Sequence, residues 1–102
     1  MPSTQDGFRG TSMVRRATVT RVEDGATFII RPNMVVKLDG IEAPPRGTPE
    51  AERAKEHLEG LVLGKKVEFD TREWDRLGRS FATVRVDEMD VNDEMRRFLD
   101  SF

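Results

Sequence analysis

Two kinds of charged side chain that serve phosphate chemistry occur in three nearby stretches of this sequence. The basic members are Lys37, Arg46, Arg76 and Arg79, and the acidic members are Glu23, Asp24 and Glu42. Metal-assisted cleavage of a phosphodiester needs carboxylates to hold a hard cation and cationic groups to stabilise the charge of the transition state. The cations on their own can still hold a phosphate or carboxylate group. What these residues do together depends on the elements that carry them.

Three antiparallel strands are predicted for the first part of the chain. Residues 17–22 are rich in β-branched side chains and alternate in the manner of a strand, and Asp24-Gly25 is a strong turn signal. Residues 26–31 form the returning strand, Pro32-Asn33 the next turn, and residues 34–38 the third strand. The turn alone explains Asp24, and Lys37 on a strand is typical of a solvated charge. Neither residue by itself indicates a site.

A loop and a helix follow. Two prolines and two glycines exclude regular structure from residues 39–47. Thr48 is the predicted N-cap of the helix, Pro49 fits its first turn and Gly64 ends it. The apolar face of this helix consists of Ala51, Ala54, Leu58, Leu61 and Val62. His57 lies on the polar side without a Cys or His partner, which indicates a surface residue rather than a metal ligand.

Two more strands and a second helix complete the chain. Residues 65–70 and 79–86 are the predicted strands, and residues 71–78 form a polar connection between them. Asp90 is the predicted cap of a helix that begins at about Val91. The apolar stripe of this helix consists of Val91, Met95, Phe98, Leu99 and Phe102.

The predicted order of elements is three strands, a helix, two strands and a helix. A three-stranded meander, a helix and a closing pair of strands are what a five-stranded OB-fold β-barrel needs, in the mainly β (α+β) class. An open α+β sheet is the alternative. The length of 102 residues corresponds to one domain. Residues 13–102 are assigned to that domain, and residues 1–12 to a flexible N-terminal lead.

Charge, cysteine content and hydropathy exclude several classes of function for this chain. The net charge is −2, so nucleic-acid binding would have to come from a local basic patch. The absence of cysteine excludes disulfides and Cys-based zinc sites. No apolar run approaches the ~18–20 residues of a transmembrane helix, and no signal peptide is recognisable, so a cytoplasmic location without a membrane partner is expected. The acidic run at residues 87–94 is interpreted as a solvated face.

Four motifs in order resemble the staphylococcal nuclease-like (thermonuclease) family. VEDGATF at residues 22–28 is similar to the family's V-x-D-G-D-T-hydrophobic turn, and VKLDGIEAPP at residues 36–45 to its R-L-x-G-I-D-A/T-P-E loop. Glu50-Ala51 opens the helix, GKKVEF follows at residues 64–69, and DRLGRSFA at residues 75–82 is similar to D-x-x-G-R-x-L-A. The resemblance covers residues 14–102. It implies an OB-fold and, in active members, calcium-dependent hydrolysis of DNA or RNA.

The sequence departs from the family's active-site pattern at four positions. Where the resemblance implies a metal-binding Asp and a general-base Glu, this chain has Ala26 and Pro45, which can neither ligate calcium nor accept a proton. Lys37 replaces an Arg and loses its bidentate fork, and Glu42 replaces a second metal-binding Asp. Arg79 matches the family's other phosphate-binding Arg. Because losing one such group typically slows catalysis by ~10²–10⁴-fold, no catalytic residue is expected, and these five positions are interpreted as vestigial.

The first hypothesis is a catalytically degenerate binding module for nucleic acid or another phosphate-bearing ligand. The expected binding residues are Lys37, Arg79, Arg46, Arg76 and Trp74. Trp74 is expected to pack against the barrel rim, with stacking on a base as the alternative. Arg79 is equally well explained by pairing with Asp75 or Glu42. No metal or cofactor is expected, and Ca²⁺ would be needed only if the site were active after all.

Two alternative functions are left open by the sequence. A protein-interaction or assembly module would use the apolar stripe of the last helix to form a homodimer or to dock a protein partner. A weak calcium-dependent phosphodiesterase would assemble a shifted metal site from Glu23, Asp24 and Glu42.

Overall fold

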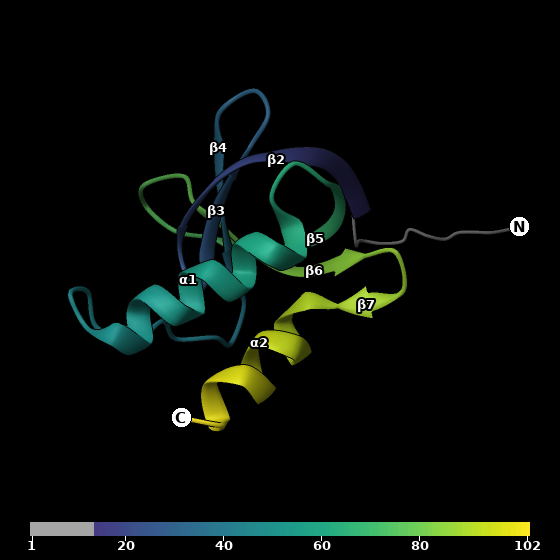
Figure 1. The fold of residues 1–102 in the computed structure, drawn as a ribbon. Coiled ribbons are helices and arrows are strands. Elements are labelled where there is room, and N and C mark those ends of the chain that lie inside the picture. Colours follow the sequence, from purple (N-terminus) through teal and green to yellow (C-terminus); the bar gives the residue numbers. More distant parts are fainter. Residues whose placement is uncertain (1–13) are drawn as a thin grey trace, which may run out of the picture.

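Three strands in a meander open the domain in the computed structural model, which describes residues 14–102 (Figure 1). They are β2 (Val14–Asp24), β3 (Thr27–Ile30) and β4 (Met34–Leu38). β2 pairs antiparallel with β3, and β3 pairs antiparallel with β4, which confirms the predicted meander. The expected lead at residues 1–12 lies outside the described part of the chain.

β2 is long and pairs with two different strands along its length. Its first part, Val14 to Thr18, pairs with β5 (Lys66–Trp74), and its second part, from Val19, pairs with β3. The pairing with β3 is irregular between Val19 and Arg21 and again between Val22 and Asp24. A bulge lets two residues that are three apart face the same side of a strand. Val19 and Val22 are accordingly both in the core.

The barrel closes through β6 (Ser80–Val86), which pairs antiparallel with β5 and parallel with β4. Five strands, β2 to β6, therefore form a closed barrel of the OB type, as predicted, and the open-sheet alternative is wrong. A two-residue strand, β7 (Met89–Asp90), was not predicted and pairs with the end of β6.

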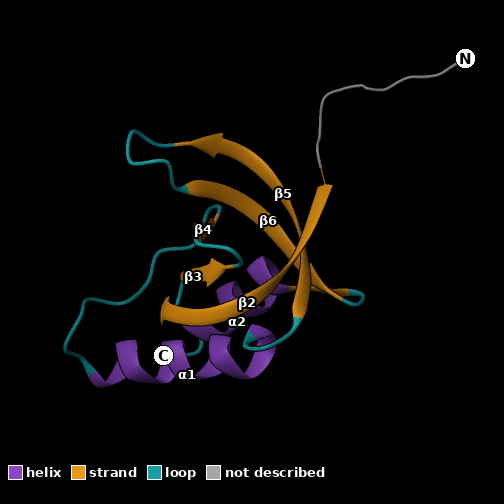
Figure 2. Ribbon diagram, turned by 90° about the horizontal axis from the view of Figure 1, so that it is seen from above, coloured by secondary structure: helices purple, strands orange, loops and turns teal. Residues whose placement is uncertain are grey.

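β5 is longer than the sequence predicted. Residues 71–74 were assigned to a polar connection, but Thr71, Glu73 and Trp74 pair with the start of β6 across an irregularity between Thr71 and Glu73. The exposed side chains of this part of β5 hide the strand from a pattern-based prediction, because its formation depends on a partner that comes later in the chain. The connection itself is confined to residues 75–79 and projects from the barrel, away from the two helices (Figure 2).

The two helices lie together on one side of the barrel (Figure 1). In α1 (Pro49–Val62) the hydroxyl of Thr48 accepts a hydrogen bond from Ala51 N at 3.1 Å, and the helix stops just before Gly64. In α2 (Val91–Asp100) the carboxylate of Asp90 accepts one from Asp93 N at 3.0 Å. Both predicted N-caps are thus confirmed. No helix within the described residues is long and apolar enough to cross a membrane.

Aromatic side chains join the two helices. The rings of His57 and Phe98 stack with centroids 4.0 Å apart, and Phe98 meets Phe102 edge-on at 5.2 Å. His57 is therefore partly buried where the two helices meet, and the stacking on Phe98 was not predicted. Met95 is fully buried and Phe98 is partly buried, so much of the predicted stripe is covered by the domain itself. A homodimer or protein partner at this helix stays a prediction.

Candidate functional site

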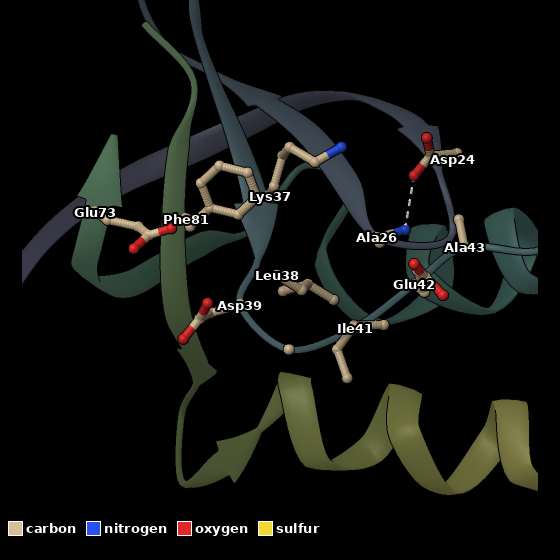
Figure 3. Close-up of a pocket in the computed structure, with 11 residues that line it drawn as sticks. Asp24, Ala26, Lys37, Leu38, Asp39, Ile41, Glu42, Ala43, Glu73 and Phe81 are labelled. Atoms are coloured by element: carbon tan, nitrogen blue, oxygen red, sulfur yellow. Dashed lines mark hydrogen bonds between the residues drawn. The ribbon is translucent and has the colours of Figure 1, made fainter. Parts of the chain in front are cut away.

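An acidic hollow of about 620 Å³ opens where the β2–β3 turn, the end of β4 and the loop after it face the β5–β6 pair (Figure 3). Its charged lining residues are Asp24, Lys37, Asp39, Glu42 and Glu73. Ala26, which stands at the position of the metal-binding Asp that the resemblance implies, also lines this hollow. Four carboxylates and one ammonium group give this hollow a net negative charge.

The carboxylates of the acidic hollow do not converge on one point. In Figure 3, Asp24 and Glu42 lie on the side of Ala26, whereas Glu73 lies beside Phe81, its cross-strand partner. Asp24 Oδ1 accepts a hydrogen bond from Ala26 N at 2.8 Å and so serves the turn that carries it. Among residues 14–102, no three acidic or histidine side chains come close enough to hold a metal ion. Because Ca²⁺ takes roughly six to eight oxygen ligands, these side chains do not fit a calcium ion.

A second, basic hollow of about 350 Å³ adjoins the acidic one and shares Asp24 and Lys37 with it. Its lining residues are Arg21, Glu23, Asp24, Thr27, Ile29, Val35, Lys37, Arg46 and Arg79. Four cations face two carboxylates here, which is a net charge of +2 in a chain whose net charge is −2. The two hollows therefore attract ligands of opposite charge.

Lys37 reaches the basic hollow because of its position in β4. The neighbouring side chains of Val36 and Leu38 are buried in the barrel, so strand alternation places Lys37 on the outer face. Its ammonium group donates a hydrogen bond to Thr27 Oγ1 at 3.3 Å, across the β3–β4 pair. Lys37 forms no ion pair with another described residue, so its charge is available to a ligand.

Arg79 is held by the loop that precedes it. The carboxylate of Asp75 accepts hydrogen bonds from Leu77 N and Arg79 N, both at 2.9 Å, and from Arg79 Nε at 2.5 Å. The predicted pairing of Arg79 with Asp75 is confirmed. Burial raises the pKa of the Asp75 carboxyl, but the hydrogen bonds from Arg79 and Leu77 outweigh this effect and hold the pKa below its usual value. The pairing uses Nε and leaves both terminal nitrogens of Arg79 without a partner in the described chain.

The remaining cations of the basic hollow come from β2 and from the loop before α1. Arg21 is bound to Glu23 through a hydrogen bond from Nε at 2.6 Å, with a terminal nitrogen 2.5 Å from the same oxygen. This pairing partly neutralises Arg21. Arg46 is exposed and, within residues 14–102, has no ion-pair partner. Lys37, Arg46 and the terminal nitrogens of Arg79 are therefore the groups best placed to bind an anion.

Two residues expected at the site lie elsewhere. Trp74 ends β5 and Arg76 belongs to the projecting 75–79 loop, and neither lines the basic hollow. The side chain of Trp74 is 51% exposed, so the expected packing against the barrel rim is wrong. Conversely, Arg21, Ile29 and Val35 were missed. Strand alternation in a correctly registered meander would have indicated them, because the outward positions of paired strands share one face.

A buried amide anchors the loop that follows β4. Asn92 Nδ2 donates hydrogen bonds to Asp39 O at 3.0 Å and Ala82 O at 3.1 Å, and its Oδ1 accepts one from Val84 N at 2.9 Å. One side chain of α2 thus ties together β6 and the start of the loop that carries Glu42. Such a connection keeps the wall of the acidic hollow in place.

Known proteins share sequence similarity with this chain. The family model described as staphylococcal nuclease homologue matches residues 35–97. Protein ParB of Escherichia coli is 35% identical over 74 residues, which cover 70% of this chain and 42% of that protein. Micrococcal nuclease of Shigella flexneri is 33% identical over 72 residues, covering 68% and 41% respectively. The chain spans about two fifths of the length of these curated relatives. With a closed five-stranded barrel and a family match over most of its described residues, this chain belongs to the staphylococcal nuclease family.

Proposed function

We propose that this domain binds a phosphate-bearing ligand, foremost nucleic acid, in the basic hollow and does not cleave it. The observation that supports this proposal is the convergence of Lys37, Arg46 and Arg79 on one hollow of an otherwise acidic protein. A phosphate needs concentrated positive charge and directed N–H donors, and both are present there. The relatives include a protein named as a nuclease, which favours nucleic acid among the candidate ligands.

The chemistry of the acidic hollow supports binding without cleavage. A methyl group stands at position 26, and position 45 is a proline without a side-chain proton acceptor. Asp24 already accepts a hydrogen bond from the backbone of its own turn. An attacking water would therefore lack both a calcium ion to polarise it and a base to take its proton. The four carboxylates nearby would also repel a second phosphate, which restricts phosphate to the basic side.

Binding is tested by titrating the protein with a nucleoside 3′,5′-bisphosphate and with a short oligothymidylate at several salt concentrations. We expect affinity to fall steeply with salt, with a logarithmic slope of about −0.7 for each phosphate contacted on a single strand. Lys37→Gln and Arg79→Gln should each weaken binding by about ten- to a hundredfold, because a hydrogen bond to a charged group contributes roughly 1.5–3 kcal/mol.

The matched control for these variants is Arg85→Gln, an exposed cation on β6 that lines neither of the two site hollows. This variant should leave the affinities for the nucleoside bisphosphate and for the oligothymidylate nearly unchanged. Equal losses in all three variants would mean that binding is diffuse rather than local. The absence of binding by the wild type at low salt would reject the proposal.

The second half of the proposal is tested with a cleavage assay on single-stranded DNA in the presence of Ca²⁺. We expect no cleavage above that of a Lys37→Gln/Arg79→Gln double variant prepared in the same way. Calcium-dependent cleavage that the double variant lacks would instead support the weak phosphodiesterase, with Glu23, Asp24 and Glu42 as its first candidate ligands.

A further inference from the structure

Two neighbouring aliphatic side chains are among the residues that line the basic hollow. Ile29 on β3 and Val35 on β4 are cross-strand partners, and both line the hollow. Their neighbours Phe28, Ile30 and Val36 are buried in the barrel, so Ile29 and Val35 face outward, where they are only partly covered. The outward face of an antiparallel sheet is ordinarily polar. An adjacent aliphatic pair on that face is a feature that packing inside the barrel does not explain.

Cations surround this apolar pair. Arg21 is the cross-strand partner of Ile29 on β2, and Lys37 follows Val35 by two residues on the same face of β4. Arg46 and Arg79 complete the lining of the hollow, which has a volume typical of small-ligand sites. An aliphatic pair beside several cations is complementary to a nucleotide unit, whose base is apolar on its face and whose phosphate is anionic.

We propose that a nucleobase of single-stranded nucleic acid lies against Ile29 and Val35 while an adjoining phosphate contacts Lys37 and Arg79. This inference rests on the proposed function and names its substrate class. A single strand is required because the face of a base is stacked and inaccessible within a duplex. The outer face of the central strands is also where OB-folds commonly take oligonucleotides.

The test compares two ligands of equal length and charge, an oligothymidylate and an abasic oligodeoxynucleotide, at one low salt concentration. The wild type should bind the oligothymidylate about tenfold more tightly, because only this ligand can cover the apolar pair. The double variant Ile29→Thr/Val35→Thr should lose this preference and bind the abasic oligomer as the wild type does. Threonine keeps the β-branched shape that strands favour, which limits the effect on folding.

Val14→Thr serves as the control, because Val14 is an exposed apolar residue of β2 that lies outside the basic hollow. It should keep the full preference for oligothymidylate. A measurement on the wild type stands independently of any variant: backbone amide shifts at Ile29 and Val35 should be clearly larger with oligothymidylate than with the abasic oligomer, relative to the shift at Lys37.

The outcomes separate the two proposals. If the wild type binds both oligomers equally, or a duplex of the same length more tightly, the contact of a base with Ile29 and Val35 is rejected and phosphate binding stands. If neither oligomer binds, the proposed function itself fails. A preference for oligothymidylate that survives in the double variant would place the base elsewhere on the surface.

Discussion

A side chain on Gly25 would collide with Ala54, because a Cβ atom at Gly25 would lie 2.6 Å from the Cβ of Ala54. The β2–β3 turn and the middle of α1 therefore meet at a point where one partner has no side chain. This close approach fixes the position of the turn, in which Asp24 and Ala26 flank Gly25, relative to the helix. The same glycine that forms the turn thus also positions one wall of the acidic hollow.

Gly25→Ala is expected to lower the free energy of unfolding by about 1–3 kcal/mol, as overpacking of a tight contact typically does. Urea denaturation measures the change. The double variant Gly25→Ala/Ala54→Gly should recover part of the loss, since it moves the methyl group from helix to turn, although glycine inside a helix costs about 1 kcal/mol. Wild-type stability of the single variant would show that the two elements can move apart freely.

Asn92→Ala is expected to destabilise the domain by about 1–3 kcal/mol, because it leaves the buried N–H of Val84 without an acceptor and the carbonyl of Asp39 without a donor. Thermal or urea unfolding measures this, with the exposed Asn33→Ala as the control. Amide exchange in residues 39–43 should also become faster. An effect no larger than that of the control would mean that the loop is held by other contacts.

The order of the 75–79 loop should depend on pH. The pKa of Asp75 is lowered in the folded state, so its ionised form contributes stability that is present above the ordinary Asp pKa of about 3.9 and is lost as the pH falls through the lowered value. An NMR titration should place the Asp75 midpoint below that of an exposed Asp, with the Arg79 amide shifting together with it. Asp75→Asn should abolish this acid-dependent shift of Arg79.

Restoring the family's residues should create calcium binding. The variant Ala26→Asp/Lys37→Arg/Glu42→Asp/Pro45→Glu is expected to be stabilised by Ca²⁺, by about 2.7 kcal/mol when the ion is at a hundred times its dissociation constant. Thermal unfolding with and without Ca²⁺ measures this. The wild type should show no shift. If the wild type is stabilised by Ca²⁺ to the same extent, the interpretation of the site as vestigial is wrong.

The single tryptophan reports on how far a bound strand extends. Because Trp74 lies outside the basic hollow, a nucleoside bisphosphate should leave its emission unchanged, and Arg76→Gln should weaken binding far less than Lys37→Gln. Quenching by a longer oligothymidylate but not by the bisphosphate would show that the strand reaches the 75–79 loop. Quenching by the bisphosphate itself would contradict the placement of phosphate in the basic hollow.

Local signals were sufficient to predict most of the fold. Thr48 and Asp90 cap the helices as expected, because a cap depends on a hydrogen bond between two residues that are only three positions apart in the sequence. The β5 extension, β7 and the position of His57 were missed. Each of these depends on a partner distant in sequence or on a tight turn, and residue types near them do not reveal it.

The sequence by itself determined the order of the elements, the family motifs and the substitutions at positions 26 and 45, because these are properties of residue type and spacing. Only the tertiary structure decided that Arg21, Ile29 and Val35 share a hollow with Lys37 and Arg79, while Trp74 and Arg76 lie outside it. Cross-strand register, the bend of β2 and the closure of β4 on β6 settle that grouping. The register of the meander depends on the bulges in β2, and the pairing of β4 with β6 joins residues far apart in the chain, so no local pattern encodes the grouping.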